Sequence, residues 1–149
     1  MDLILWRHAE AEDAYPDLSR ALTGKGRKQA SRIAEWLNPR LPEDIRIIAS
    51  PAVRTVQTAQ ALGREFEVVD GCAPGATAAR ILEAAGWPDS TRPVLIVGHQ
   101  PVLGQIAARL LFGQEADLSI RKAAVWWFHG RDRSESEVAL RAVVNPDWL

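Results

Sequence analysis

Short apolar runs that stop abruptly at polar residues constrain the fold of this chain more than any other feature. The first run, Leu3–Trp6, gives way within one residue to Arg7 and His8. Its length and composition are typical of a strand buried in a parallel sheet. In open α/β sheets, ligands bind at the carboxyl ends of the strands. The pattern therefore predicts that Arg7 and His8 emerge at a ligand-binding edge, although an isolated histidine at a strand end can equally face water alone.

Similar runs recur along the chain, and helical patterns separate them. We expect further strands at Ile45–Ala49, Phe66–Val69, Pro93–Val97, Ala124–His129 and Val138–Val144, with a polar turn over residues 130–136. We expect helices from Thr23 as N-cap to about Leu37, from about Ala52 to Gly63 with Ser50 as N-cap, from Thr77 to Ala85 and from Val102 to Leu111. This alternation predicts an α/β fold in one domain over residues 1–149: a three-layer α/β/α sandwich whose mostly parallel central sheet has an antiparallel edge hairpin.

Composition excludes several classes of partner and site. The formal net charge is −1, whereas nucleic-acid or anionic-membrane binding needs a basic excess. Cys72 is the only cysteine, so neither an internal disulfide nor a cysteine zinc site is expected. No acidic cluster suits magnesium, and we expect neither metal nor cofactor. With no signal peptide expected before the first strand and no apolar run of transmembrane length, we expect a cytoplasmic protein.

Polar residues of matching type follow three of the predicted strands. Arg7 and His8 follow the first, Ser50 the second with Arg54 in the helix behind it, and His99 the run that ends at Val97. If these strands are parallel, their carboxyl ends share one edge of the sheet. Two imidazoles, two guanidiniums and a helix N-terminus at one edge indicate a site for a dianion, most naturally a phosphoryl group.

Each of these groups has a role in phosphoryl transfer. A neutral imidazole is a competent nucleophile, so His8 is expected to form a covalent phosphohistidine. Arg7 and Arg54 are expected to hold the phosphoryl oxygens, with protonated His99 as a further cationic donor. Ser50 is a candidate to donate a hydrogen bond to substrate. Arg20 either reaches the phosphate from its loop or is a solvated charge.

These residues resemble a known family. The motifs are Arg7-His8-Ala9, Ser50-Pro51-x-x-Arg54 extending to Thr58, Gly98-His99-x-Pro101 and Arg20-x-Leu22-Thr23-x-x-Gly26. In this order they resemble the histidine phosphatase superfamily, branch 1, and within it the SixA-like phosphohistidine phosphatases. The resemblance covers essentially the whole chain. It implies a phosphoglycerate mutase-like fold, His8 as nucleophile, a phosphate pocket of Arg7, Arg54 and His99, and no metal.

The chain departs from the pattern at two places. Ala9 stands where many relatives have glycine, which matters only if the turn there is left-handed. Larger members place a glutamate after the third strand, where this chain offers Asp70. Asp70 and Glu10 are candidate proton donors, but an aspartate in a turn more often accepts local hydrogen bonds. A missing acid favours a phosphohistidine substrate, because an imidazole leaves more easily than an alkoxide.

The sequence therefore predicts a metal-independent hydrolase that removes phosphate from phosphohistidine in a signalling protein, acting as a monomer. A phosphatase for small phosphomonoesters, such as sugar phosphates or nucleotides, is the alternative. A phosphate-binding module without catalysis is a third reading.

Overall fold

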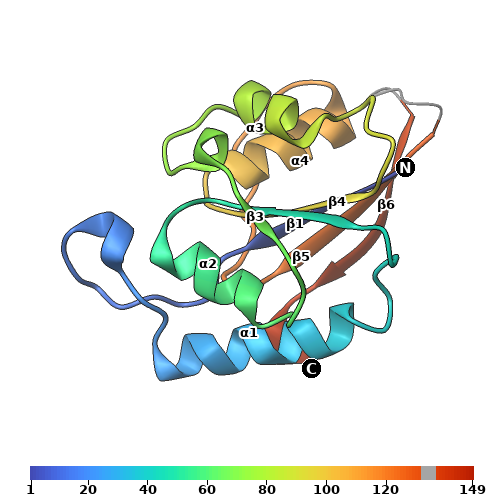
Figure 1. Ribbon diagram of the computed structural model, residues 1–149. Coiled ribbons are helices and arrows are strands. Elements are labelled where there is room, and N and C mark those ends of the chain that lie inside the picture. The colour runs from blue at the N-terminus through green and yellow to red at the C-terminus, as the bar shows by residue number, and fades with distance from the viewer. Residues whose placement is uncertain (132–136) are drawn as a thin grey trace.

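Within residues 1–131 and 137–149, which the computed structural model describes, six strands form one sheet in the order β3-β2-β4-β1-β5-β6 (Figure 1). The strands are β1 (Asp2–Arg7), β2 (Arg46–Ala49), β3 (Glu67–Val68), β4 (Val94–Gly98), β5 (Val125–Gly130) and β6 (Val138–Val144). Strands β1 to β4 are parallel, whereas β5 is antiparallel to both β1 and β6. The predicted mostly parallel sheet with an antiparallel edge is confirmed.

Helices cover both faces of this sheet. One face carries α3 (Ala78–Ala85) and α4 (Val102–Phe112), and the other carries α1 (Gly24–Leu37) and α2 (Val53–Gln60) (Figure 1). Successive side chains of a strand point to opposite faces, so β1 divides its residues between two hydrophobic clusters. Leu3 and Leu5 pack in the cluster that includes α3 and α4, whereas Ile4 and Trp6 pack in the cluster that includes α1. This division produces the predicted three layers.

Capping residues begin and end several helices where the sequence predicts. The Thr23 hydroxyl accepts a hydrogen bond from the Gly26 amide and caps α1, and Thr77 caps α3. Gly86 and Gly113 follow α3 and α4 in the left-handed conformation that a residue without a Cβ adopts most easily.

Other predicted boundaries are wrong. The helix expected over about Ala52–Gly63 spans only Val53–Gln60, and its N-cap is Ala52, not Ser50. The reason is that Ser50 still extends β2: its amide donates to the carbonyl of Val97 at 3.2 Å. The strand expected over Phe66–Val69 shortens to Glu67–Val68, which pairs with the last two residues of β2. Of the turn expected over residues 130–136, residues 132–136 lie outside the described residues.

The segment before β5 is bound to the carboxyl end of β1. The Ala123 carbonyl accepts a hydrogen bond from Trp6 Nε1 at 2.9 Å, and the Ala123 amide donates to the carbonyl of His8 at 3.1 Å. Arg7 Nη1 donates to the carbonyl of Ile120 at 2.8 Å. These bonds hold residues 120–124 beside the strand end that carries Arg7 and His8.

A loop between β1 and α1 protrudes from the same end of the molecule (Figure 1). Its base is pinned to α1, because the Thr23 amide donates to the Glu10 carbonyl at 3.0 Å. Gly26 makes this approach possible: a Cβ at that position would lie 2.0 Å from the Glu10 oxygen. The loop therefore leaves the sheet from a fixed point.

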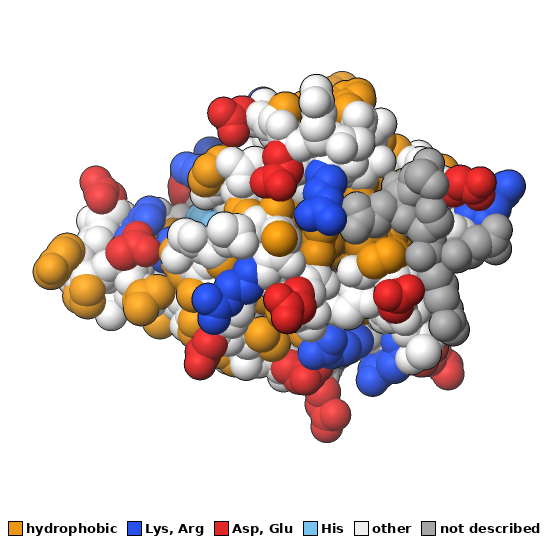
Figure 2. Space-filling view, turned by 90° about the horizontal axis from the view of Figure 1, so that it is seen from above, with side chains coloured by type: hydrophobic (Ala, Val, Ile, Leu, Met, Phe, Trp, Pro, Cys, Tyr) orange, Lys and Arg blue, Asp and Glu red, His pale blue; other side chains and the backbone are white. Residues whose placement is uncertain are grey.

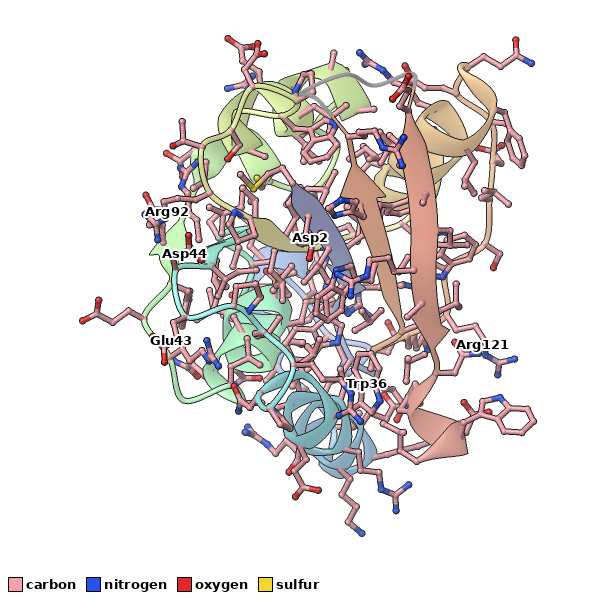
Figure 3. All side chains as sticks on the ribbon, turned by 90° about the vertical axis from the view of Figure 1, so that its right-hand side faces the viewer. Asp2, Trp36, Glu43, Asp44, Arg92 and Arg121 are labelled. Atoms are coloured by element: carbon pink, nitrogen blue, oxygen red, sulfur yellow. The ribbon has the colours of Figure 1, made fainter. Side chains whose placement is uncertain are left out.

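At the opposite end of β1, the Asp2 side chain contacts residues of both β5 and β6. Its carboxylate accepts hydrogen bonds from Trp127 Nε1 at 3.1 Å and Arg141 Nη1 at 3.0 Å, and lies 2.5 Å from His129 Nδ1 (Figure 3). His129 is thus at the amino end of β1, away from His8. No helix among the described residues is long and apolar enough to cross a bilayer.

Candidate active site

Three strand ends meet at one edge of the sheet. The register pairs Arg7 with Gly98 and Ala49 with Val97, so His8, Ser50 and His99 are the next residues along their strands. Backbone pairing continues past the strands, since the His8 amide donates to the Gly98 carbonyl at 3.0 Å. The imidazole centroids of His8 and His99 lie 5.3 Å apart. The predicted convergence of these two histidines is confirmed.

The hydrogen bonding of His8 determines which ring nitrogen is free to react. Its Nδ1 lies 2.7 Å from the carbonyl oxygen of Ala9. A carbonyl only accepts, so Nδ1 carries the proton and Nε2 carries the lone pair. Burial lowers the pKa of His8 to about 4, and the positive charges of Arg54, Arg7 and Arg20 act in the same direction. At neutral pH His8 is therefore an uncharged imidazole with a free Nε2.

His99 is held by Ser50. Its Nε2 lies 2.7 Å from the Ser50 hydroxyl, and both side chains are buried. Burial, followed by the charge of Arg54, lowers the pKa of His99 to about 3. The expectation of a protonated His99 is therefore wrong for the free protein, because burial, and after it the charge of Arg54, disfavours the protonated ring. The structure gives Ser50 the position of an anchor for His99 in place of its predicted role as a helix cap.

Thr58, the last residue of the second motif, links two backbone segments beside the pocket. Its hydroxyl donates to the carbonyl of Arg54 at 2.7 Å and accepts from the amide of Ala9 at 3.1 Å. Ala9 itself is unstrained, because Ala123 is the only described non-glycine residue with a positive φ. Alanine in place of glycine after the Arg-His pair therefore costs the turn nothing.

Cationic side chains surround the two histidines in a pocket of about 240 Å³. Its lining includes the predicted Arg7, His8, Arg20, Arg54 and His99, together with Ala11, Pro74, Gly75, Gln100 and Lys122. In Figure 2 a histidine side chain reaches the surface beside the protruding loop. Four buried side-chain nitrogens in the described residues lack a hydrogen-bond partner, and three of them belong to Arg7, Arg54 and His99. Unsatisfied buried donors concentrated in one place are typical of a binding site.

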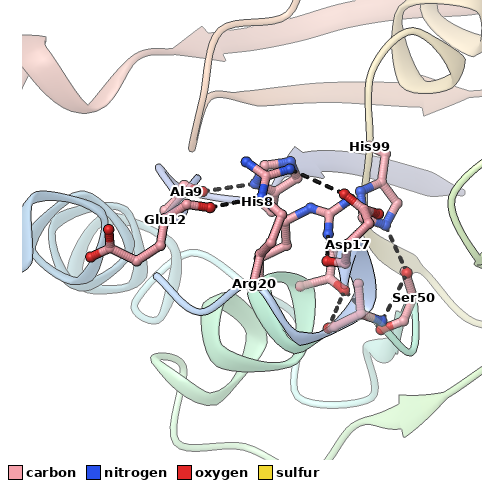
Figure 4. Close-up of polar contacts among 10 residues, drawn as sticks. His8, Ala9, Glu12, Asp17, Arg20, Ser50 and His99 are labelled. Carbon is pink, nitrogen blue, oxygen red and sulfur yellow. Dashed lines mark hydrogen bonds and ion pairs between the residues drawn. The ribbon is translucent and has the colours of Figure 1, made fainter. Parts of the chain in front are cut away.

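Asp17, from the protruding loop, forms ion pairs with two arginines of this pocket (Figure 4). One carboxylate oxygen lies 3.2 Å from Arg54 Nη2, and the other lies 3.2 Å from Arg20 Nη1. The Asp17 carbonyl also accepts from Arg54 Nη1 at 2.9 Å. The hydrogen bond from Arg20, reinforced by the charge of Arg54, lowers the pKa of Asp17. A carboxylate of the chain itself, that of Asp17, therefore contacts the guanidiniums that we expect to bind a phosphoryl group.

The structure does not bring the two candidate proton donors into the pocket lining. Glu10 points into a neighbouring groove, where its carboxylate accepts from the Thr23 hydroxyl at 2.8 Å. Asp70 begins a short 3-10 turn, Asp70–Cys72, and is exposed. Reasoning from the sequence also missed Lys122, which lies in a turn, and Asp17, which begins a short 3-10 helix; neither belongs to a motif. Among the described residues, no three histidine, cysteine or acidic side chains are grouped so as to hold a metal ion.

Comparison with known proteins identifies the relatives of this chain. The family model described as histidine phosphatase superfamily (branch 1) matches residues 3–75. A phosphohistidine phosphatase SixA homolog from Haemophilus influenzae is 30% identical over 141 residues, which cover 84% of this chain and 85% of that protein. Phosphohistidine phosphatase SixA from Escherichia coli is 28% identical over 125 residues, 76% of each chain.

The fold has a close counterpart among solved structures. The structure of the protein histidine phosphatase SixA complexed with tungstate superposes with a TM-score of 0.81 at 25% identity. The match covers 99% of this chain and 98% of that one. The predicted phosphoglycerate mutase-like fold is thereby confirmed.

We expect Asp17→Asn to strengthen the binding of inorganic phosphate or tungstate. The substitution removes a negative charge that competes for Arg54 and Arg20. Exposed ion pairs are worth up to about 1 kcal/mol, so affinity should rise by up to about fivefold. Titration calorimetry measures this change. Asp13→Asn, on the same exposed loop, is the matched control and should leave affinity unchanged; equal affinities for all three proteins would refute competition by Asp17.

We also expect the free energy of unfolding to fall as pH is lowered from about 6.5 to about 4. An unfolded histidine takes up its proton near pH 6.5, whereas folded His8 does so only near pH 4. The unfolded state therefore binds more protons in this window, so stability is full above it and is lost as pH falls. The loss due to His8 is roughly 3 kcal/mol, and His99 adds to it. Urea denaturation at both ends of the window measures the loss, which His8→Gln should reduce; an equal loss in that variant contradicts the assignment.

Proposed function

The chain belongs to the histidine phosphatase superfamily (branch 1), and on that premise we propose that it removes phosphate from phosphohistidine through a covalent intermediate on His8. The proposed substrate is a phosphohistidine in a signalling protein. The observation that carries this proposal is the state of His8: a neutral imidazole with a free Nε2, held 5.3 Å from a second imidazole in a cationic pocket.

The proposed reaction has two displacements at phosphorus. In the first, the lone pair of His8 Nε2 attacks, and the P–N bond to the substrate imidazole breaks. Its electron pair stays on the substrate nitrogen, which takes up a proton from water. In the second, water attacks phospho-His8, the P–N bond to Nε2 breaks with its electron pair returning to Nε2, and inorganic phosphate leaves. The proton that this water loses neutralises the hydroxide left by the first displacement.

The guanidiniums supply the electrostatic part of this mechanism. Charge spreads over the nonbridging phosphoryl oxygens in the transition state. In the proposal, Arg7 and Arg54 hold these oxygens, and Arg20 and Lys122 add positive charge from the rim. Arg7 and Arg54 are held before substrate arrives, Arg7 by the carbonyl of Ile120 and the buried Arg54 by the carbonyl of Asp17. Reorganisation is therefore confined to release of the Asp17 carboxylate. His99, neutral and anchored by Ser50, offers a hydrogen bond rather than a charge.

The residues that line the pocket indicate which leaving group the reaction can use. The described residues that line it include no aspartate or glutamate, and the nearby Asp17 is kept deprotonated by Arg20 and Arg54. An alkoxide needs a proton from a positioned acid as it departs, whereas an imidazole does not. This composition supports a phosphoramidate over a phosphomonoester.

Exposed apolar side chains beside the pocket support a protein substrate. Tyr15 is 96% exposed and Leu18 is 51% exposed, both on the loop whose Asp17 contacts Arg54. Tyrosine is enriched where proteins bind one another, because it buries a large area at a small entropic cost. A cytoplasmic location and a monomeric state stay predictions.

We expect wild-type protein to form a phosphoenzyme on His8 that is labile in acid and stable in alkali. Incubation with a radiolabelled phosphoryl donor and alkaline quenching measures the incorporated label. His8→Ala should incorporate none, because no nucleophile remains. His129→Ala, a histidine substitution at the opposite edge of the sheet, should label like wild type. Label retained by His8→Ala would overturn the assignment of the nucleophile.

We expect kcat/KM for a phosphohistidine peptide to exceed that for sugar phosphates and nucleotides by about a hundredfold or more, the scale of a missing general acid. Phosphate release from each substrate under the same conditions measures the ratio. A higher kcat/KM for a sugar phosphate or nucleotide would establish the small-molecule phosphatase in its place. Tungstate binding without turnover of any substrate would establish a non-catalytic module.

A further inference from the structure

A second, larger hollow adjoins the phosphate pocket. It has a volume of about 690 Å³ and is lined by six cationic side chains, which define what we call the basic groove: Arg7, Lys25, Lys28, Arg32, Arg121 and Lys122. Arg7 and Lys122 also line the phosphate pocket, so the two hollows are neighbours. Any molecule that fills the groove would lie directly beside the reacting phosphoryl group.

The charge of the groove is unbalanced. Five of its cations are exposed, and within the described residues none of these five forms an ion pair. Two acids line the same groove, but Glu10 already accepts a hydrogen bond from Thr23, and Asp147 is exposed at the far end of the chain. The chain as a whole has a net charge of −1. This face therefore concentrates positive charge that the protein balances elsewhere, as expected of a surface that attracts an anionic partner.

The spacing of the cations indicates an elongated partner. Lys25, Lys28 and Arg32 lie three and four residues apart on α1, so they share one face and span about 10 Å of helix. The opposite wall comes from the segment before β5, where Arg121 lies on the β6 side of the molecule (Figure 3). A row of this length is too long for one phosphate and suits several anionic groups in succession.

The lining favours carboxylates over nucleotides. Single-stranded nucleic acids bind to grooves that combine cations with aromatic platforms on which bases stack. Besides its six cations, the groove is lined by Glu10, Gln29, Ser119, Pro146 and Asp147, so none of the described residues that line it is aromatic. Beside the phosphate pocket, on the loop whose Asp17 contacts Arg54, Tyr15 and Leu18 offer apolar contacts of the kind that a protein uses.

We propose that the basic groove docks an acidic stretch of the substrate protein, next to the phosphohistidine that enters the pocket. This inference rests on the proposed function and specifies its partner: a protein whose phosphohistidine is flanked by aspartate and glutamate. Docking of this kind acts on encounter and on KM rather than on the chemical step, because the groove cations other than Arg7 and Lys122 do not line the phosphate pocket.

Two phosphohistidine peptides of equal length test the proposal on the intact protein, one flanked by aspartate and glutamate and the other by serine and glycine. Wild type should hydrolyse the acidic peptide with a kcat/KM about tenfold higher at low salt, mainly through KM. This preference should shrink at about 0.5 M salt, where exposed charges are screened. Lys28→Glu and Arg32→Glu should each reduce the preference, and the double variant should abolish or reverse it.

Arg80→Glu is the matched control. Arg80 is an exposed arginine on α3, on the opposite face of the sheet, and its reversal changes the net charge equally. It should keep the preference of wild type. Loss of the preference in Arg80→Glu to the same extent as in Arg32→Glu would reduce the effect to net charge and overturn docking in the groove.

The remaining outcomes separate this inference from the proposed function. Equal hydrolysis of the two peptides by wild type overturns the docking proposal and leaves the phosphatase intact. Hydrolysis of neither peptide overturns the proposed function. Fluorescence anisotropy with an unphosphorylated acidic peptide then tests the groove on its own. Displacement of that peptide by a single-stranded oligonucleotide at much lower concentration than by the peptide itself would assign the groove to nucleic acid instead.

Discussion

Parallel pairing of β1, β2 and β4 is the constraint on which the site depends. Because these strands run in the same direction and in register, their last residues lie side by side, and the amides of His8 and Ser50 continue the ladder beyond the strands. The two imidazoles and the Ser50 hydroxyl are therefore positioned by backbone hydrogen bonds inside a buried sheet, not by flexible loops. A shift of one residue in either register would send His8, Ser50 or His99 to the opposite face.

Burial and clustered positive charge then determine the protonation of that edge. Both effects lower the pKa of His8 and His99, so the site contains neutral imidazoles among permanently charged guanidiniums. The same arrangement leaves an excess of positive charge, and Asp17 partly offsets it by lying on Arg54 and Arg20. The proposed attraction for a dianion and the neutral state of His8, the proposed nucleophile, thus have one physical origin. This state costs stability in two ways: the unsatisfied buried nitrogens cost free energy at any pH, and the histidines that resist protonation cost it as pH falls below about 6.5.

Exposed apolar and cationic side chains surround the pocket at the protein surface. The protruding loop supplies exposed Tyr15 and Leu18 beside the pocket, and α1 supplies a row of cations in the neighbouring groove. The pocket is small beside the adjoining groove, about 240 Å³ against about 690 Å³. A molecule that used both surfaces would extend well beyond a single phosphorylated group, which is why recognition of a protein fits this face better than recognition of a metabolite.

Local patterns in the sequence determined the strands, most helix ends and the convergence of residues at the candidate site. Apolar runs ending in Arg7-His8, Ser50 and His99 sufficed, because parallel strands place their carboxyl ends together whatever the details of packing. Tertiary structure alone decided the partners of these side chains. Ser50 anchors His99 instead of capping α2, and Glu10 turns away from the pocket. Asp17 and Lys122 reach the pocket from segments without a motif. The reason is that strand and helix formation depend on neighbours in sequence. Hydrogen-bond partners, burial and the resulting pKa shifts depend on which distant segments the fold brings into contact.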